Sequence, residues 1–156
     1  MTAIALDSNL LLLLVVGRAS RDAISRHKRL KAYEPSDYDL LFNLVDVASE
    51  LIVTPNAWTE VSNIAPGGLI GDYKIAIIES LATLVQISAE RYVPSADVAK
   101  CIEFASLGLA DTAWLVALDP QARFLTVDLE LFHAAQSRGL KAEKFNHLRV
   151  QSGFLN

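Results

Sequence analysis

The chain has 156 residues, of which 52% are hydrophobic and 21% are charged, and its formal net charge is −4 at pH 7. The length favours a single domain over residues 1–156, and the composition excludes a disordered, collagen-like or highly charged coiled-coil protein. The acidic balance argues against a globally basic nucleic-acid-binding surface, although it leaves room for a local basic patch.

The sequence predicts a cytoplasmic protein without membrane contact. Its longest purely apolar run, residues 10–16, is far shorter than the roughly 20 residues that span a membrane. The start of the chain lacks the basic segment of a signal peptide, and Asp7 interrupts the apolar stretch that follows. The single cysteine, Cys101, excludes an intramolecular disulfide and a cysteine-based zinc site, and fits a reducing compartment.

Short, almost continuously apolar runs alternate with longer segments of helical periodicity. Strands are predicted at residues 3–6, 51–54 and 123–127, with weaker candidates at 84–88 and 144–147. Helices are predicted at residues 36–50, 55–64, 72–83, 96–104, 110–118 and 129–137. This alternation is typical of an α/β protein with a mostly parallel sheet of about five strands between layers of helices.

Four acidic residues are expected at the carboxyl edge of this sheet, where open α/β sheets bind ligands. Asp7 and Asp128 directly follow predicted strands. Asp111 lies in the first turn of a strongly apolar helix, and Glu60 lies about one and a half turns into the helix that follows the second strand. The alternative is that Asp7 and Asp111 only cap helices, whose N-termini favour acidic residues.

The chemistry of these side chains favours a hard divalent cation. Clustered carboxylates repel one another unless basic side chains or a metal ion compensate them. The three histidines show no metal-ligand spacing, so an all-oxygen site for Mg²⁺ or Mn²⁺ and phosphate chemistry are expected.

At these acids the sequence resembles the PIN-domain family of metal-dependent nucleases. Residues 6–9 (Leu-Asp-Ser-Asn) resemble the family's opening motif, and residues 58–61 (Trp-Thr-Glu-Val) resemble its second. Residues 109–113 (Leu-Ala-Asp-Thr-Ala) and 125–128 (Leu-Thr-Val-Asp) resemble the third and fourth. The resemblance extends over residues 3–148 and includes the closing helix and last strand.

The resemblance implies a three-layer α/β/α fold with strand order 3-2-1-4-5. It also implies that Asp7, Glu60, Asp111 and Asp128 line an acidic pocket for one or two Mg²⁺ or Mn²⁺ ions. The implied activity is that of a ribonuclease with RNA as its substrate. A protein inhibitor (an antitoxin) is an expected partner if the protein is toxin-like.

We assign the roles that phosphodiester hydrolysis requires to these residues. Asp7 and Asp111 are expected as direct or water-bridged metal ligands, and Asp128 would share the metal. Glu60 is the candidate to orient or deprotonate the attacking water. Three polar residues are candidates to orient the carboxylates or to contact phosphate: Ser8, Asn9 and Thr126.

A run of basic residues between positions 18 and 31 is predicted to flank the acids and follow a nucleic-acid backbone. A solvated helix face and a protein contact are the alternatives for this run. Its members are Arg18, Arg21, Arg26, Lys28, Arg29 and Lys31.

Two other functions are alternatives to the nuclease, and a homodimer is a further expectation. The first alternative is a non-catalytic scaffold that binds RNA or protein. The second is a haloacid dehalogenase-like phosphatase, which would use Thr54 but needs an acid where this chain has Asn9. A homodimer is conceivable because residues 10–16 and the helix at 36–50 supply apolar surface.

Overall fold

The computed structural model describes residues 1–155, and side chains for residues 1–153. Over these residues one all-parallel sheet forms in the order β3-β2-β1-β4-β5, which confirms the predicted class and strand order. Its strands are β1 (Ile4–Leu6), β2 (Leu51–Val53), β3 (Ala89–Glu90), β4 (Arg123–Thr126) and β5 (Lys141–Lys144).

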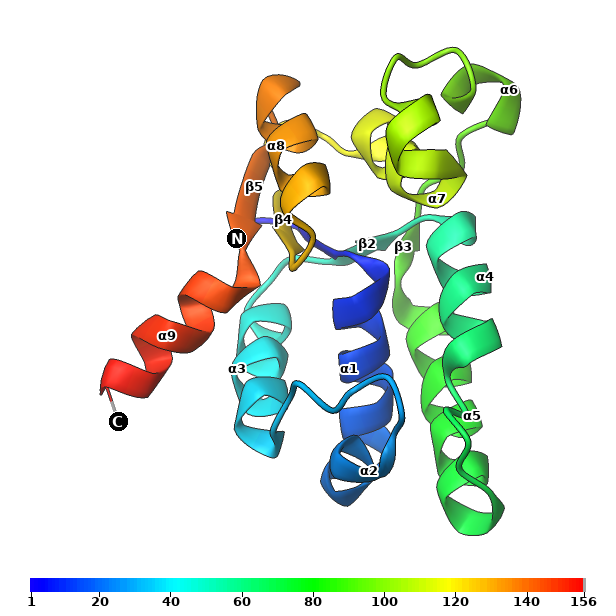
Figure 1. The fold of residues 1–156 in the computed structure, drawn as a ribbon, viewed down its shortest axis with the longest axis vertical. Helices are drawn as coiled ribbons and strands as arrows, with labels where there is room; N and C mark the ends of the chain where they lie inside the picture. The colour runs from blue at the N-terminus through cyan, green and yellow to red at the C-terminus, as the bar shows by residue number, and fades with distance from the viewer. Residues whose placement is uncertain (156) are drawn as a thin grey trace.

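Helices flank the sheet on both sides, with α1, α3 and α5 on one side and α7 and α8 on the other (Figure 1). The helix α9 extends away from the rest of the molecule near the C-terminus. The helices are α1 (Ser8–Ala19), α2 (Arg21–Arg26), α3 (Pro35–Asp46), α4 (Pro55–Ile64), α5 (Gly71–Ile87), α6 (Ser95–Val98), α7 (Phe104–Ala117), α8 (Leu129–Ser137) and α9 (Phe145–Leu155).

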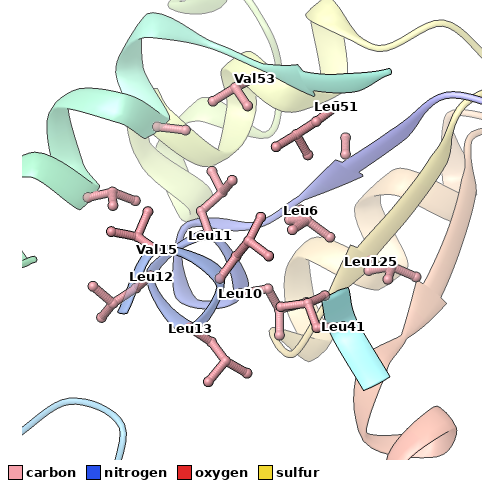
Figure 2. Packing of buried hydrophobic residues seen from close by; sticks show 14 of the residues in the cluster. Leu6, Leu10, Leu11, Leu12, Leu13, Val15, Leu41, Leu51, Val53 and Leu125 are labelled. Carbon is pink, nitrogen blue, oxygen red and sulfur yellow. The ribbon is translucent and has the colours of Figure 1, made fainter. Parts of the chain in front are cut away.

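The helix α1 is the centre of the hydrophobic core. Every side chain from Leu10 to Val16 is at most 2% exposed. A helix that is apolar on all sides must be covered on all sides, and Figure 2 shows its side chains pointing towards β1, β2, β4 and α3. Residues 10–16 therefore offer no surface to a second copy, and this part of the argument for a homodimer is wrong.

Two close approaches hold helices against α1. A Cβ at Gly17 would lie 2.3 Å from the ring of Tyr38, so only glycine lets α3 pack this closely. On another side the Ser80 hydroxyl of α5 donates a 2.7 Å hydrogen bond to the Val15 carbonyl. These contacts fix the axis of α1, and with it the start of the helix at Ser8.

The two weaker strand predictions are wrong in position. Residues 84–87 belong to α5, because Ile77, Leu81 and Leu84 continue one buried helical stripe, and β3 begins only at Ala89. The last strand is residues 141–144, a polar segment at the edge of the sheet that a search for apolar runs overlooks. Residues 145–147 begin α9 instead.

Among residues 1–155, no helix is both long enough and apolar enough to cross a membrane.

Candidate active site at the carboxyl edge of the sheet

Asp7 joins three elements at the end of β1. It is the N-cap of α1, and its Oδ1 accepts a 2.9 Å hydrogen bond from the Leu10 amide. Its Oδ2 accepts hydrogen bonds from the Thr126 hydroxyl (2.6 Å) and the Val127 amide (2.7 Å) beyond β4. Burial raises the pKa of Asp7, and these three hydrogen bonds oppose the rise. Three of about four acceptor positions are used, which leaves one on Oδ1 for a ligand.

Thr126 connects Asp7 to Asp128. While its hydroxyl donates to Asp7, the same oxygen accepts a 3.0 Å hydrogen bond from the Asp128 amide. Asp128 is the N-cap of α8, and its Oδ1 accepts from the Leu131 amide at 2.9 Å. The predicted orienting role of Thr126 thus has a direct geometric basis. Of the two residues that the alternative interpretation treats as helix caps, Asp7 is one, whereas Asp111 lies inside α7 and is not.

Glu60 reaches the same region from α4. This helix begins at the end of β2, where the buried Thr54 hydroxyl accepts from the Ala57 amide, so Thr54 is a helix cap. The Ser8 hydroxyl of α1 donates a 3.2 Å hydrogen bond to Glu60 Oε2. Ser8 therefore positions Glu60 beside Asp7. Asn9, the third predicted orienting residue, is exposed, and no hydrogen bond of its side chain occurs in the described part of the chain.

Asp111 owes its position to a kink in α7. Gly108 has φ 79° and ψ −177°, a conformation that residues with a Cβ avoid, and it divides the helix into two segments. Asp111 lies in the first turn of the second segment and is half-buried. Unlike Asp7, its carboxylate accepts no hydrogen bond from any residue among those described.

The electrostatics show that the four predicted acids lie near one another. Burial, followed by the negative charges of Asp128, Glu60, Asp7 and Glu130, raises the pKa of Asp111 to about 7. Within residues 1–153, no salt bridge compensates any of the four predicted acids. The structure thus places acidic side chains from the N-caps of α1 and α8 and from α4 around the half-buried carboxyl group of Asp111 in α7.

The donor set suits a hard divalent cation, but the side chains do not form a closed metal site as they stand. Carboxylate oxygens are the preferred ligands of Mg²⁺ and Mn²⁺, and the unpaired charge around Asp111 is what such an ion relieves. In the described residues, no three His, Cys, Asp or Glu side chains converge closely enough to hold a metal ion. Glu60 and Asp128 are exposed, so an ion from solvent can reach their carboxylates, although each already accepts one hydrogen bond, from Ser8 and from the Leu131 amide.

The predicted basic run is not gathered beside the acids. Arg18 lies in the last turn of α1, roughly 16 Å along the helix from Asp7 at 1.5 Å per residue. Arg21 forms a salt bridge with Asp39, and Arg26 forms one with Asp22. These three arginines therefore do not flank the acids, because the whole of α1 lies between.

The second half of the basic run lies between α2 and α3, and the segment that carries it ends near the site at Tyr33. Lys28, Arg29 and Lys31 are exposed on the segment that leads from α2 to α3. At the end of this segment, burial and the charge of Asp7 raise the pKa of Tyr33 to about 12, so Tyr33 lies near Asp7. Arg149 of α9 packs on the Tyr33 ring with its guanidinium carbon 5.0 Å from the centroid.

Sequence reasoning missed the polar residues at the junction of β5 and α9. Lys144, Asn146 and His147 line a cavity together with Thr126 and Asp128. The signal that could have found them is the correct end of the last strand, because Lys144 ends β5 at the same carboxyl edge where Asp128 follows β4.

Comparison of the chain with protein-family models, with curated proteins and with solved structures finds no match.

Proposed function

We propose that the protein is a Mg²⁺- or Mn²⁺-dependent endoribonuclease that hydrolyses phosphodiester bonds of RNA. The observation that carries the proposal is the environment of Asp111. Three other predicted site carboxylates surround this half-buried acid, none of the four forms a salt bridge within residues 1–153, and the pKa of Asp111 is raised to about 7. The resemblance of the motifs around these acids to those of PIN-domain nucleases points to the same chemistry.

The metal would be held by Asp7 through its remaining acceptor position, by Asp111 and by Asp128. When bound, such an ion lowers the pKa of water and stabilises negative charge on the phosphate oxygens. The Ser8 hydroxyl keeps Glu60 close to these acids, where it can orient the attacking water and accept its proton. Thr126 holds Asp7 and the start of α8 in register, and Lys28, Arg29 and Lys31 supply positive charge for the approach of RNA.

The proposal includes a cytoplasmic location, consistent with the single cysteine, and a protein inhibitor if the protein acts as a toxin. The phosphatase alternative loses the support of Thr54, because the Thr54 hydroxyl is buried and accepts a hydrogen bond from the Ala57 amide.

The test is cleavage of a mixed RNA pool, with single-stranded DNA in parallel, in Mn²⁺, Mg²⁺ or EDTA. Wild type is compared with Asp111→Asn and with Asp97→Asn, an exposed acid on α6 that serves as the matched control. We expect cleavage that requires metal, persists in Asp97→Asn and falls at least about 100-fold in Asp111→Asn, more than loss of an outer positioning contact would cost.

Two outcomes would contradict the proposal. Cleavage that survives in Asp111→Asn would come from a contaminant or from another site. The absence of both cleavage and metal binding, measured by calorimetry, would favour the non-catalytic scaffold, and hydrolysis of p-nitrophenyl phosphate alone would favour the phosphatase.

A further inference from the structure

A cavity of about 230 Å³ lies where β4, β5, α8 and α9 meet. Thr126 and Asp128 contribute to one wall, and Lys144, Asn146 and His147 contribute to the other. The first wall belongs to the acidic edge described above. The second wall carries nitrogen donors and no carboxylate, so the cavity joins the candidate metal ligand Asp128 to a set of groups that attract anions.

The side chains of the second wall are held in place by their neighbours, and their donor groups remain available to a ligand. The Lys144 ammonium lies 4.8 Å from the centroid of the Phe132 ring, and within residues 1–153 no carboxylate approaches it within 4.0 Å. Asn146 Oδ1 accepts a 3.1 Å hydrogen bond from Arg149, which leaves the Nδ2 amide group of Asn146 as a donor. Arg149 is itself fixed by a bidentate pair with Asp37 at 2.8 and 3.0 Å.

Lys144 differs in this respect from most arginines of the protein. Six arginines pair with acidic residues and have little charge left for a ligand: Arg21, Arg26, Arg91, Arg123, Arg138 and Arg149. An RNA phosphate that approaches Asp128 is repelled by the acids unless a nearby cation compensates them. Lys144 supplies that cation within the same cavity.

We infer that this cavity is a phosphate subsite that binds the RNA backbone next to the bond that is cleaved. The inference rests on the proposed nuclease function and adds the path that the RNA takes across the site. The substrate would cross the ends of β4 and β5 over Asp128, with its phosphate between Lys144, Asn146 and His147, rather than follow the arginines at the far end of α1. Lys144 is a substrate-binding residue in this account, and Arg149 positions Asn146.

The test compares Lys144→Met with Lys141→Met in the cleavage of a short fluorescent RNA in Mn²⁺ at several salt concentrations. Methionine keeps much of the lysine stem over Phe132 and removes only the charge. Lys141 lies on the same strand, and its ammonium donates to Gln121 Oε1 outside the cavity, so it is a matched control. Thermal unfolding checks that both variants are folded.

We expect KM to rise about five- to tenfold in Lys144→Met, with kcat within about twofold of wild type, because one charge-assisted phosphate contact is lost. The slope of log KM against log salt should fall by about 0.7, the value for one phosphate of a single strand. Lys144→Arg should recover most of the loss, and Lys141→Met should match wild type. Equal KM values in Lys144→Met and Lys141→Met would overturn the subsite and leave the nuclease intact.

Binding of the same RNA and of inorganic phosphate in EDTA separates the two proposals. RNA binding that weakens in Lys144→Met, in a protein that never cleaves, would support the subsite and contradict the nuclease. Competition by inorganic phosphate alone, with no difference in RNA affinity between the variants, would overturn the subsite as part of an RNA path. A wild-type protein that neither cleaves nor binds RNA would overturn both.

Discussion

Asp7 and Asp111 belong to the same acidic edge, but the protein holds them in opposite ways. Asp7 is buried at the β1–α1 junction and receives three hydrogen bonds that connect β1, α1 and β4. Asp111 follows the kink of α7 without such bonds and faces the charges of its acidic neighbours. The Asp7 carboxylate is therefore part of the hydrogen-bonding network that stabilises the fold. The Asp111 carboxylate is destabilised by repulsion, which a bound cation would reduce.

The largest expected difference between Asp7 and Asp111 is in how their substitution by asparagine changes the stability of the protein. Asp7→Asn places an amide N–H₂ group where a carboxylate oxygen accepts hydrogen bonds, and should lower the free energy of unfolding by about 2–4 kcal/mol, since buried donors lose their partners. Urea unfolding at pH 8 in EDTA measures it. Asp111→Asn should instead raise the free energy of unfolding by about 1–3 kcal/mol, because it removes repulsion. Equal destabilisation by both substitutions would contradict the comparison.

The pH dependence of stability sharpens the same contrast. The folded-state pKa of Asp111 is about 7 against 3.8 for an ordinary aspartate, so the folded protein binds more protons between these values. Asp111 therefore costs stability as the pH rises from about 4 to 7. The difference in unfolding free energy between wild type and Asp111→Asn should grow over this range in EDTA. A difference that does not change with pH would show that Asp111 titrates normally.

His27 should respond to pH with the opposite sign. Its ring lies in the segment between α2 and α3, where Nε2 donates to the Ala65 carbonyl at 2.9 Å and Nδ1 accepts from the Arg29 amide at 3.1 Å. Burial lowers the pKa of His27 below 6.5, so its contribution to stability is lost as the pH falls through and below that value.

The expected loss is about 1 kcal/mol, because protonation of Nδ1 removes an acceptor. Urea unfolding of wild type and His27→Gln between pH 7.5 and about 5 measures it. If the difference in unfolding free energy between the two proteins stayed constant over this pH range, burial would not lower the pKa of His27.

The smallest expected effect concerns Glu60. Ser8→Ala removes the hydroxyl that donates to Glu60 Oε2, and should lower kcat by about tenfold while it changes stability by less than about 1 kcal/mol. Ser25→Ala, at an exposed position of α2 where the hydroxyl donates to the Asp22 carbonyl, is the matched control and should leave kcat unchanged. A similar loss of activity in both variants would contradict a specific role of Ser8 in positioning Glu60.

The parts of this account that were predictable are those with local signals. β1, α4 and α8 follow from short apolar runs and from the caps Asp7, Thr54 and Asp128, whose side chains bond to amides three residues away. The bonds of Asp7 to Thr126 and Val127 span β1 and β4, so their geometry depends on the whole sheet. The edge strand β5 has no apolar pattern, and with its end misplaced the cavity at Lys144 could not be found.

The predicted position of the basic run was wrong for a different reason. The prediction treated residues that are close to Asp7 in sequence as close to it in space. Arg18 is only eleven positions from Asp7, yet a straight helix separates them. The depth of α1 in the core also follows from packing by α3, α4 and α5, which composition alone does not indicate.

The most direct test of the central claim is the thermal unfolding midpoint of wild type and Asp111→Asn at pH 8, each in EDTA and in millimolar Mn²⁺. The account predicts that Mn²⁺ raises the midpoint of wild type by about 5 °C or more and leaves that of Asp111→Asn nearly unchanged, since a ligand that binds only the folded state stabilises it. The same shift in both proteins, or no shift in either, would contradict the claim that the acids around Asp111 bind a divalent cation.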